Sequence, residues 1–121
     1  MVDSEIRDPD RIAALLRAEI EGLEEPPFAS VTVESGSGTE PGTPAFSVAD
    51  EAGTLLRATK GPDRLTVEVT RRPDAVAEAA EAAGLRARPK ATTPPATVLF
   101  VPRAADVKGV IDVLRAIEGD R

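Results

Sequence analysis

Hydrophobic residues recur at helical spacing in three segments of the chain. The first helix is predicted to start at Pro9, with Asp8 as its capping residue and an apolar stripe at Ile12, Leu15, Leu16, Ile20 and Leu23. The second is predicted to start at Pro73 and to end before Gly84, a residue that suits the left-handed backbone after a helix. The third is predicted to start at Ala104 or Ala105, with apolar residues at Val107, Val110, Ile111, Leu114 and Ile117.

Between these helices, apolar and polar residues alternate in the pattern of half-buried strands. Strands are predicted at residues 28–34, 45–48, 55–59 and 65–70, which short turns join into an antiparallel meander. Residues 85–90 are predicted as an edge strand, because Pro89 and alternating positive charges suit an unpaired edge. Residues 96–101 are apolar on both faces and are predicted as a central strand.

The predicted order of elements is α-β-β-β-β-α-(β)-β-α. It indicates an α+β fold, with three helices on one face of a mostly antiparallel sheet of about five or six strands. If residues 85–90 are not a strand, the strands at 65–70 and 96–101 would instead form a parallel pair joined through the second helix. A length of 121 residues predicts a single domain over residues 1–121, with residues 35–44 as a flexible internal loop.

Missing residue types narrow the chemistry. The chain has no Cys, His, Asn or Gln, which removes thiolate chemistry, the usual general base and the commonest metal ligand. The glycine-rich loop lacks the Lys of a phosphate-binding loop, and no dinucleotide fingerprint is present, so neither a cofactor nor a metal is predicted. Nothing in the sequence favours an enzyme, although a site built on paired carboxylates stays open.

Charge is distributed unevenly along a chain whose formal net charge is −6. Residues 1–56 contain twelve acidic residues and three Arg, whereas residues 57–121 contain twelve basic and nine acidic residues. A candidate patch for an anion or an acidic partner therefore lies in the second half, at Arg71, Arg72, Arg86, Arg88, Lys90 and Arg103. The alternative is a charged, solvated sheet edge, or pairing with the acidic first helix. Nucleic acid is disfavoured as a ligand because the chain has no Tyr or Trp for base stacking.

The third helix offers a second candidate surface. Its apolar stripe is long, and Val113 stands beside the main row, so a homodimer or partner interface is one interpretation and core contact is the other. The residues concerned are Val107, Val110, Val113 and Leu114.

As a string of elements, the chain resembles the type III secretion chaperones. The resemblance rests on the helix RIAALLRAEIEGL, the strand RLTVEVT and the helices AVAEAAEAAGL and VIDVLRAI. It implies a small, acidic, usually dimeric protein that binds partner polypeptides. No signature motif is matched, and this chain has one more predicted strand before the second helix.

The hypothesis from the sequence is a non-enzymatic binding or adaptor domain that engages a protein partner or itself. The alternative is a binder of a phosphorylated ligand or nucleic acid through the basic patch. The acidic N-terminus has no apolar core and no segment is long enough to span a bilayer, which predicts a cytoplasmic protein without membrane contact.

Overall fold

Three helices and six strands account for most of the computed structural model, which describes residues 8–22, 32–36, 42–50, 53–91 and 95–119. In chain order the elements are α1 (Pro9–Gly22), β1 (Thr32–Ser35), β2 (Pro44–Asp50), β3 (Gly53–Lys60), β4 (Leu65–Val69), α2 (Pro73–Ala82), β5 (Arg86–Lys90), β6 (Ala96–Val101), the short 3-10 helix η2 (Ala104–Asp106) and α3 (Val107–Gly119). The order predicted from the hydrophobic pattern is confirmed, including the strand at β5.

Local capping explains where α1 begins and where α2 ends. Asp8 caps α1, since its Oδ1 accepts a hydrogen bond of 3.1 Å from the backbone N–H of Asp10. Helix α2 ends as the sequence predicts, because Gly84 has a φ of 78°. This turn lets the N–H of Leu85 reach back to the carbonyl of Ala80 at 2.9 Å.

The strands form one sheet in the order β1-β2-β3-β4-β6-β5, and every neighbouring pair is antiparallel. The meander from β1 to β4 and the position of β5 at an edge are therefore confirmed. The alternative of a parallel pair is wrong, because β6 runs antiparallel to β4. After α2 the chain forms β5, which is an edge strand of the sheet. The next strand, β6, then pairs with β5 on one side and with β4 on the other.

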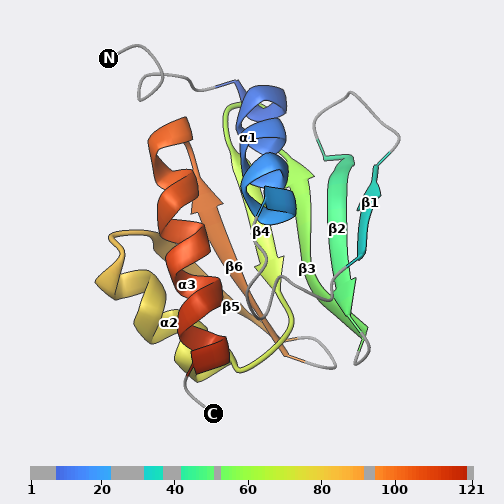
Figure 1. The fold of residues 1–121 in the computed structure, drawn as a ribbon. Coiled ribbons are helices and arrows are strands. Elements are labelled where there is room, and N and C mark those ends of the chain that lie inside the picture. Colours follow the sequence, from blue (N-terminus) through green and yellow to red (C-terminus); the bar gives the residue numbers. More distant parts are fainter. Residues whose placement is uncertain (1–7, 23–31, 37–41, 51–52, 92–94, 120–121) are drawn as a thin grey trace.

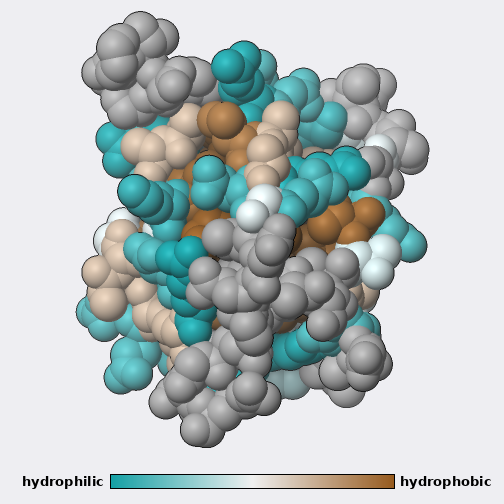
Figure 2. Space-filling model, viewed as in Figure 1, coloured by the Kyte–Doolittle hydropathy of each residue, from teal (hydrophilic) through white to brown (hydrophobic). Residues whose placement is uncertain are grey.

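All three helices lie against the same face of the sheet (Figure 1). Helix α1 contacts β2, β3 and β4, whereas α2 contacts β5 and β6. Helix α3 lies between α1 and α2 and contacts both. Figure 2 looks onto this helical side, where hydrophilic and apolar residues alternate over the surface.

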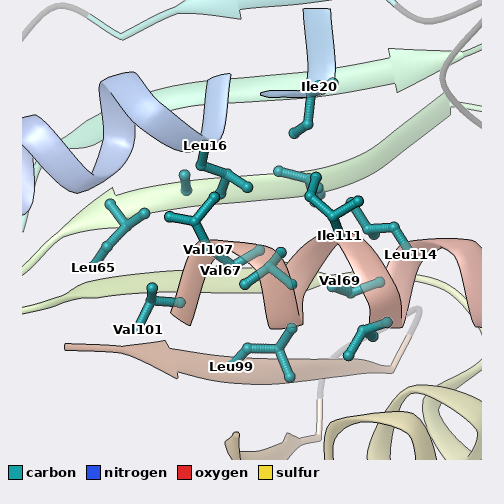
Figure 3. Packing of buried hydrophobic residues seen from close by; sticks show 14 of the residues in the cluster. Leu16, Ile20, Leu65, Val67, Val69, Leu99, Val101, Val107, Ile111 and Leu114 are labelled. Atoms are coloured by element: carbon teal, nitrogen blue, oxygen red, sulfur yellow. The ribbon is translucent and has the colours of Figure 1, made fainter. Parts of the chain in front are cut away.

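Aliphatic side chains from the sheet and the helices interlock to form the core (Figure 3). Alternate residues of the central strands point toward the helices, for example Val67 of β4 and Leu99 of β6, both 0% exposed. In β3 the register shifts beside Leu55, so that this residue and Leu56 are both buried although they are neighbours in the strand.

Two of the predicted segments are only partly described. The first four residues of the strand predicted at 28–34 lie outside the described residues, and β1 begins at Thr32. Within the loop predicted at 35–44, residues 37–41 also lie outside them. At the two ends of that loop the backbone is hydrogen bonded: Gly36 N–H donates to the carbonyl of Ala45 at 2.8 Å, and Lys60 N–H to that of Thr43 at 3.0 Å.

Candidate functional site

The six residues of the predicted basic patch do not lie together. Arg86, Arg88 and Lys90 follow one another along the exposed edge strand β5. Since side chains alternate along a strand, all three project from the same face. Arg71 and Arg72 follow β4, and Arg103 follows β6 at the end of the sheet near Arg86. Only the three residues of β5 therefore form a continuous basic strip.

The Arg71 side chain points away from β5, toward the end of β2 and the start of β3. Its Nη1 and Nη2 donate to the two carboxylate oxygens of Asp50 at 2.6 and 2.5 Å, and Nη2 also donates to the carbonyl of Gly53 at 3.1 Å. Asp50 ends β2 and Gly53 begins β3. Arg71 therefore connects the end of β4 with the end of β2 and the start of β3, and it is a structural residue whose carboxylate partner belongs to β2 and not to an acidic ligand or to the first helix.

Replacing Arg71 with alanine is expected to lower the free energy of unfolding by about 1–2 kcal/mol, since a two-pronged pair with both side chains mostly covered is stronger than an exposed one. Arg71→Lys should recover less than half of the loss, because an ammonium cannot make both bonds in one plane. Urea unfolding measures both changes, and a double-mutant cycle with Asp50→Ala isolates the pair. A coupling free energy near zero would contradict this role.

Arg72 and Arg103 are also separate from β5. Arg72 precedes α2 in a left-handed conformation, with a φ of 48°, and lines a shallow depression with Pro73, Asp74, Ala75 and Glu78. The Nη2 atom of Arg103 lies 3.5 Å from Oδ1 of Asp106 in η2. Both arginines are thus next to carboxylates of the helical layer, and neither extends the strip on β5.

The strip belongs to a larger surface, the face of the sheet opposite the helices, which we call the open face. The strand register places one residue of each strand in a single row across this face. In sheet order the row contains Glu34, Ser47, Arg57, Glu68, Val98 and Arg88. In the neighbouring row Arg86 lies opposite Phe100, which lies opposite Thr66. Val98 and Phe100 are half-buried, so the open face combines cations with apolar surface.

The open face contains two further cations, Arg57 and Arg64, that the sequence pattern did not identify as part of the patch. Arg57 is exposed in β3 and lies opposite Glu68. Arg64 precedes β4, and its guanidinium carbon lies 4.6 Å from the centre of the Phe100 ring, within the range of a cation–π contact. Each stands alone in the sequence, and only the pairing of β3, β4, β6 and β5 brings them near Arg86 and Arg88.

The open face is basic, whereas the helical layer is acidic. Among the described residues, the open face has five cations, Arg57, Arg64, Arg86, Arg88 and Lys90, and two carboxylates, Glu34 and Glu68. The described helical side chains include eight carboxylates but only four cations, and those of α2 include no cation. The uneven charge along the sequence therefore becomes a difference between two faces of the molecule.

One ion pair lies within the open face itself. Nζ of Lys90 donates to Oε1 of Glu68 at 3.0 Å, with the Lys90 side chain 49% exposed and that of Glu68 19% exposed. Within the part of the chain that the structure describes, Arg57, Arg86 and Arg88 form no ion pair. These three guanidinium groups are available to a ligand.

The candidate interface on α3 is placed in the core. Val107 is 5% exposed, and Val110, Val113 and Leu114 are 0% exposed. These side chains belong to the same core cluster as those of the sheet and of α1. Figure 3 shows Val107 and Leu114 within this cluster. Their burial agrees with core contact, the second of the two interpretations, and leaves none of the four on the surface.

No described helix combines the length and apolar character needed to cross a membrane. Over the described ranges, no three acidic residues gather as a metal site would need. The described residues thus define an α+β protein with one helical layer and one uncovered, basic sheet face.

The chain belongs to a family of unknown function (DUF7993), whose model matches residues 1–120. A comparison with curated proteins found no match, and neither did a comparison with solved structures. The resemblance to the type III secretion chaperones therefore rests on element order alone.

Proposed function

We propose that this protein is a non-enzymatic binding domain that engages a protein partner through its open face. The observation that carries the proposal is the group of arginines without ion pairs among the described residues, Arg57, Arg86 and Arg88, around the half-buried Val98 and Phe100. Arginine and aromatic residues are enriched where proteins bind one another, and apolar surface beside them adds free energy when it is covered.

A different protein fits this face better than a second copy of the chain. A two-fold dimer through the open face would bring each arginine strip against another surface of the same positive sign. Pairing between two β5 edges meets the same repulsion, and Pro89 lacks a backbone donor. The proposed partner is therefore another protein.

Nucleic acid or a phosphorylated ligand is the second candidate, because the arginine strip would also attract phosphate. Arg86 and Arg88 are two residues apart, which separates their backbone positions by about 7 Å. Against nucleic acid, the chain carries a formal net charge of −6, which repels a long polyanion outside the open face. The ring of Phe100 is occupied by Arg64, which leaves it poorly placed for base stacking.

Site-specific photo-crosslinking in the native cell tests the proposed surface. A benzophenone amino acid placed at Phe100 or at Val98 is expected to form an adduct with one and the same protein. The control positions are Ala14 in α1 and Ala77 in α2, which are exposed on the helical side. Adducts only from the control positions would contradict the proposal. Adducts between nucleic acid and the benzophenone residue at the position of Phe100 would favour the second candidate.

A further inference from the structure

We infer that the open face binds an acidic segment of polypeptide in extended conformation, whose carboxylates pair with Arg86 and Arg88, with Arg57 and Arg64 adding positive charge to the face. This inference rests on the proposed function and names the chemistry of its partner.

The charge of the open face favours an acidic ligand. Lys90 and Glu68 neutralise each other across 3.0 Å. The remaining charges among the described residues are four arginines and Glu34, which lies at the far end of the row, on β1. The approach of a carboxylate to these four arginines is favourable, whereas a cationic ligand would be repelled.

All four remaining cations are arginines, although the chain has three Lys as well. A guanidinium group presents a planar fork of donors that matches the two oxygens of a carboxylate. It also keeps a fixed geometry on an apolar surface, as Arg64 does over Phe100. The face is therefore suited to side chains of Asp and Glu rather than to a diffuse negative surface.

The spacing of the arginines matches an extended chain. Arg86 and Arg88 project from the same face of β5 with a repeat of about 7 Å, which is also the repeat of alternate side chains in any extended segment. Arg57 lies in the row of Arg88, three strand positions away, at about 14 Å. A ligand segment running along β5 would place alternate carboxylates at Arg86 and Arg88, and the side chains between them would point away from the sheet.

The rest of the molecule favours a short acidic segment over a long polyanion. The net charge is −6, and the described part of the helical layer is acidic. A nucleic acid extending beyond the four arginines would meet repulsion from that layer, whereas a short acidic segment stays within the open face.

Fluorescence anisotropy on the full chain tests the inference. The probe is a fluorescein-labelled peptide of about twelve residues that alternates Glu and Thr. A peptide of the same composition with its Glu residues in one block tests the extended spacing, and an oligothymidylate of the same length tests nucleic acid. The alternating peptide is expected to bind the most tightly of the three, and binding should weaken as salt rises from about 50 to 200 mM.

The variant Arg86→Glu, Arg88→Glu is expected to weaken binding of the alternating peptide at least about tenfold. The matched control is Arg11→Glu, Lys108→Glu, which changes the net charge equally on exposed residues of α1 and α3. The control should stay within about twofold of the original protein, since the charges lie on the opposite side and are screened. Circular dichroism confirms that both variants are folded.

Three results would overturn the inference: equal weakening in both variants, tighter binding of the block peptide, or tighter binding of the oligothymidylate. The alternating peptide could fail to bind while the benzophenone residue at the position of Phe100 still forms its protein adduct. In that case the proposed function stands and the acidic chemistry of the partner is wrong. If both experiments fail, the open face is not a binding surface.

Discussion

Replacing Leu114 with alanine is expected to lower the free energy of unfolding by about 2–5 kcal/mol, the range typical of a buried leucine that leaves a cavity. Leu114 is 0% exposed in the cluster that joins α3 to the sheet. Urea unfolding at two protein concentrations measures the change. The loss should be the same at both concentrations, because the side chain stabilises the single chain and not an association.

The control for this variant is Lys108→Ala, an exposed position in the same helix, which should change stability by less than about 0.5 kcal/mol. A different outcome would reverse the assignment of α3. If Leu114→Ala left unfolding unchanged but altered the molecular mass in light scattering, this helix would face a partner, the first of the two interpretations of its apolar stripe.

Alanine at Gly36 is expected to lower the free energy of unfolding by about 1–3 kcal/mol through overpacking. A Cβ atom at this position would lie 1.9 Å from the carbonyl oxygen of Pro44 and 2.5 Å from its carbon. Both atoms belong to the backbone, so β1 and β2 must move apart at this end. Hydrogen exchange should show lost protection at the Glu34 amide, which faces β2 two residues before Gly36, while Val67 in β4 stays protected.

Gly22→Ala is the matched control, because nothing lies within 4 Å of a Cβ atom at that position, the last residue of α1. Alanine there should be neutral or stabilising by up to about 1 kcal/mol, since it restricts the unfolded chain. If Gly36→Ala were as stable as Gly22→Ala, the close approach of Gly36 to Pro44 would be wrong.

The hydrophobic pattern predicted most of the elements because each depends on a local rule. Asp8 and Pro9 specify the start of α1. Gly84 ends α2 because its backbone is left-handed. Alternation identified β4, whose Leu65, Val67 and Val69 are all 0% exposed. Pro89 and the charges beside it placed β5 at an edge.

The candidate site was only partly predictable, because it depends on which strands pair. Arg86 and Arg88 were identified together since they are two residues apart on one strand. Arg71 was grouped with them by its position in the sequence, but its bond to Asp50 spans 21 residues and turns it toward β2. Arg57 and Arg64 stand alone in the sequence and join the open face only through the register of β3, β4 and β6.

The α+β class and the order of the elements were predictable from the sequence, as was the excess of positive charge in the second half of the chain. These properties follow from local periodicity, capping and composition. Three features depend on the folded chain: β6 lies between β4 and β5, Leu55 and Leu56 both face the core, and the apolar side of α3 is buried. Strand pairing and core packing join residues far apart in the chain, and no local pattern specifies which partners meet.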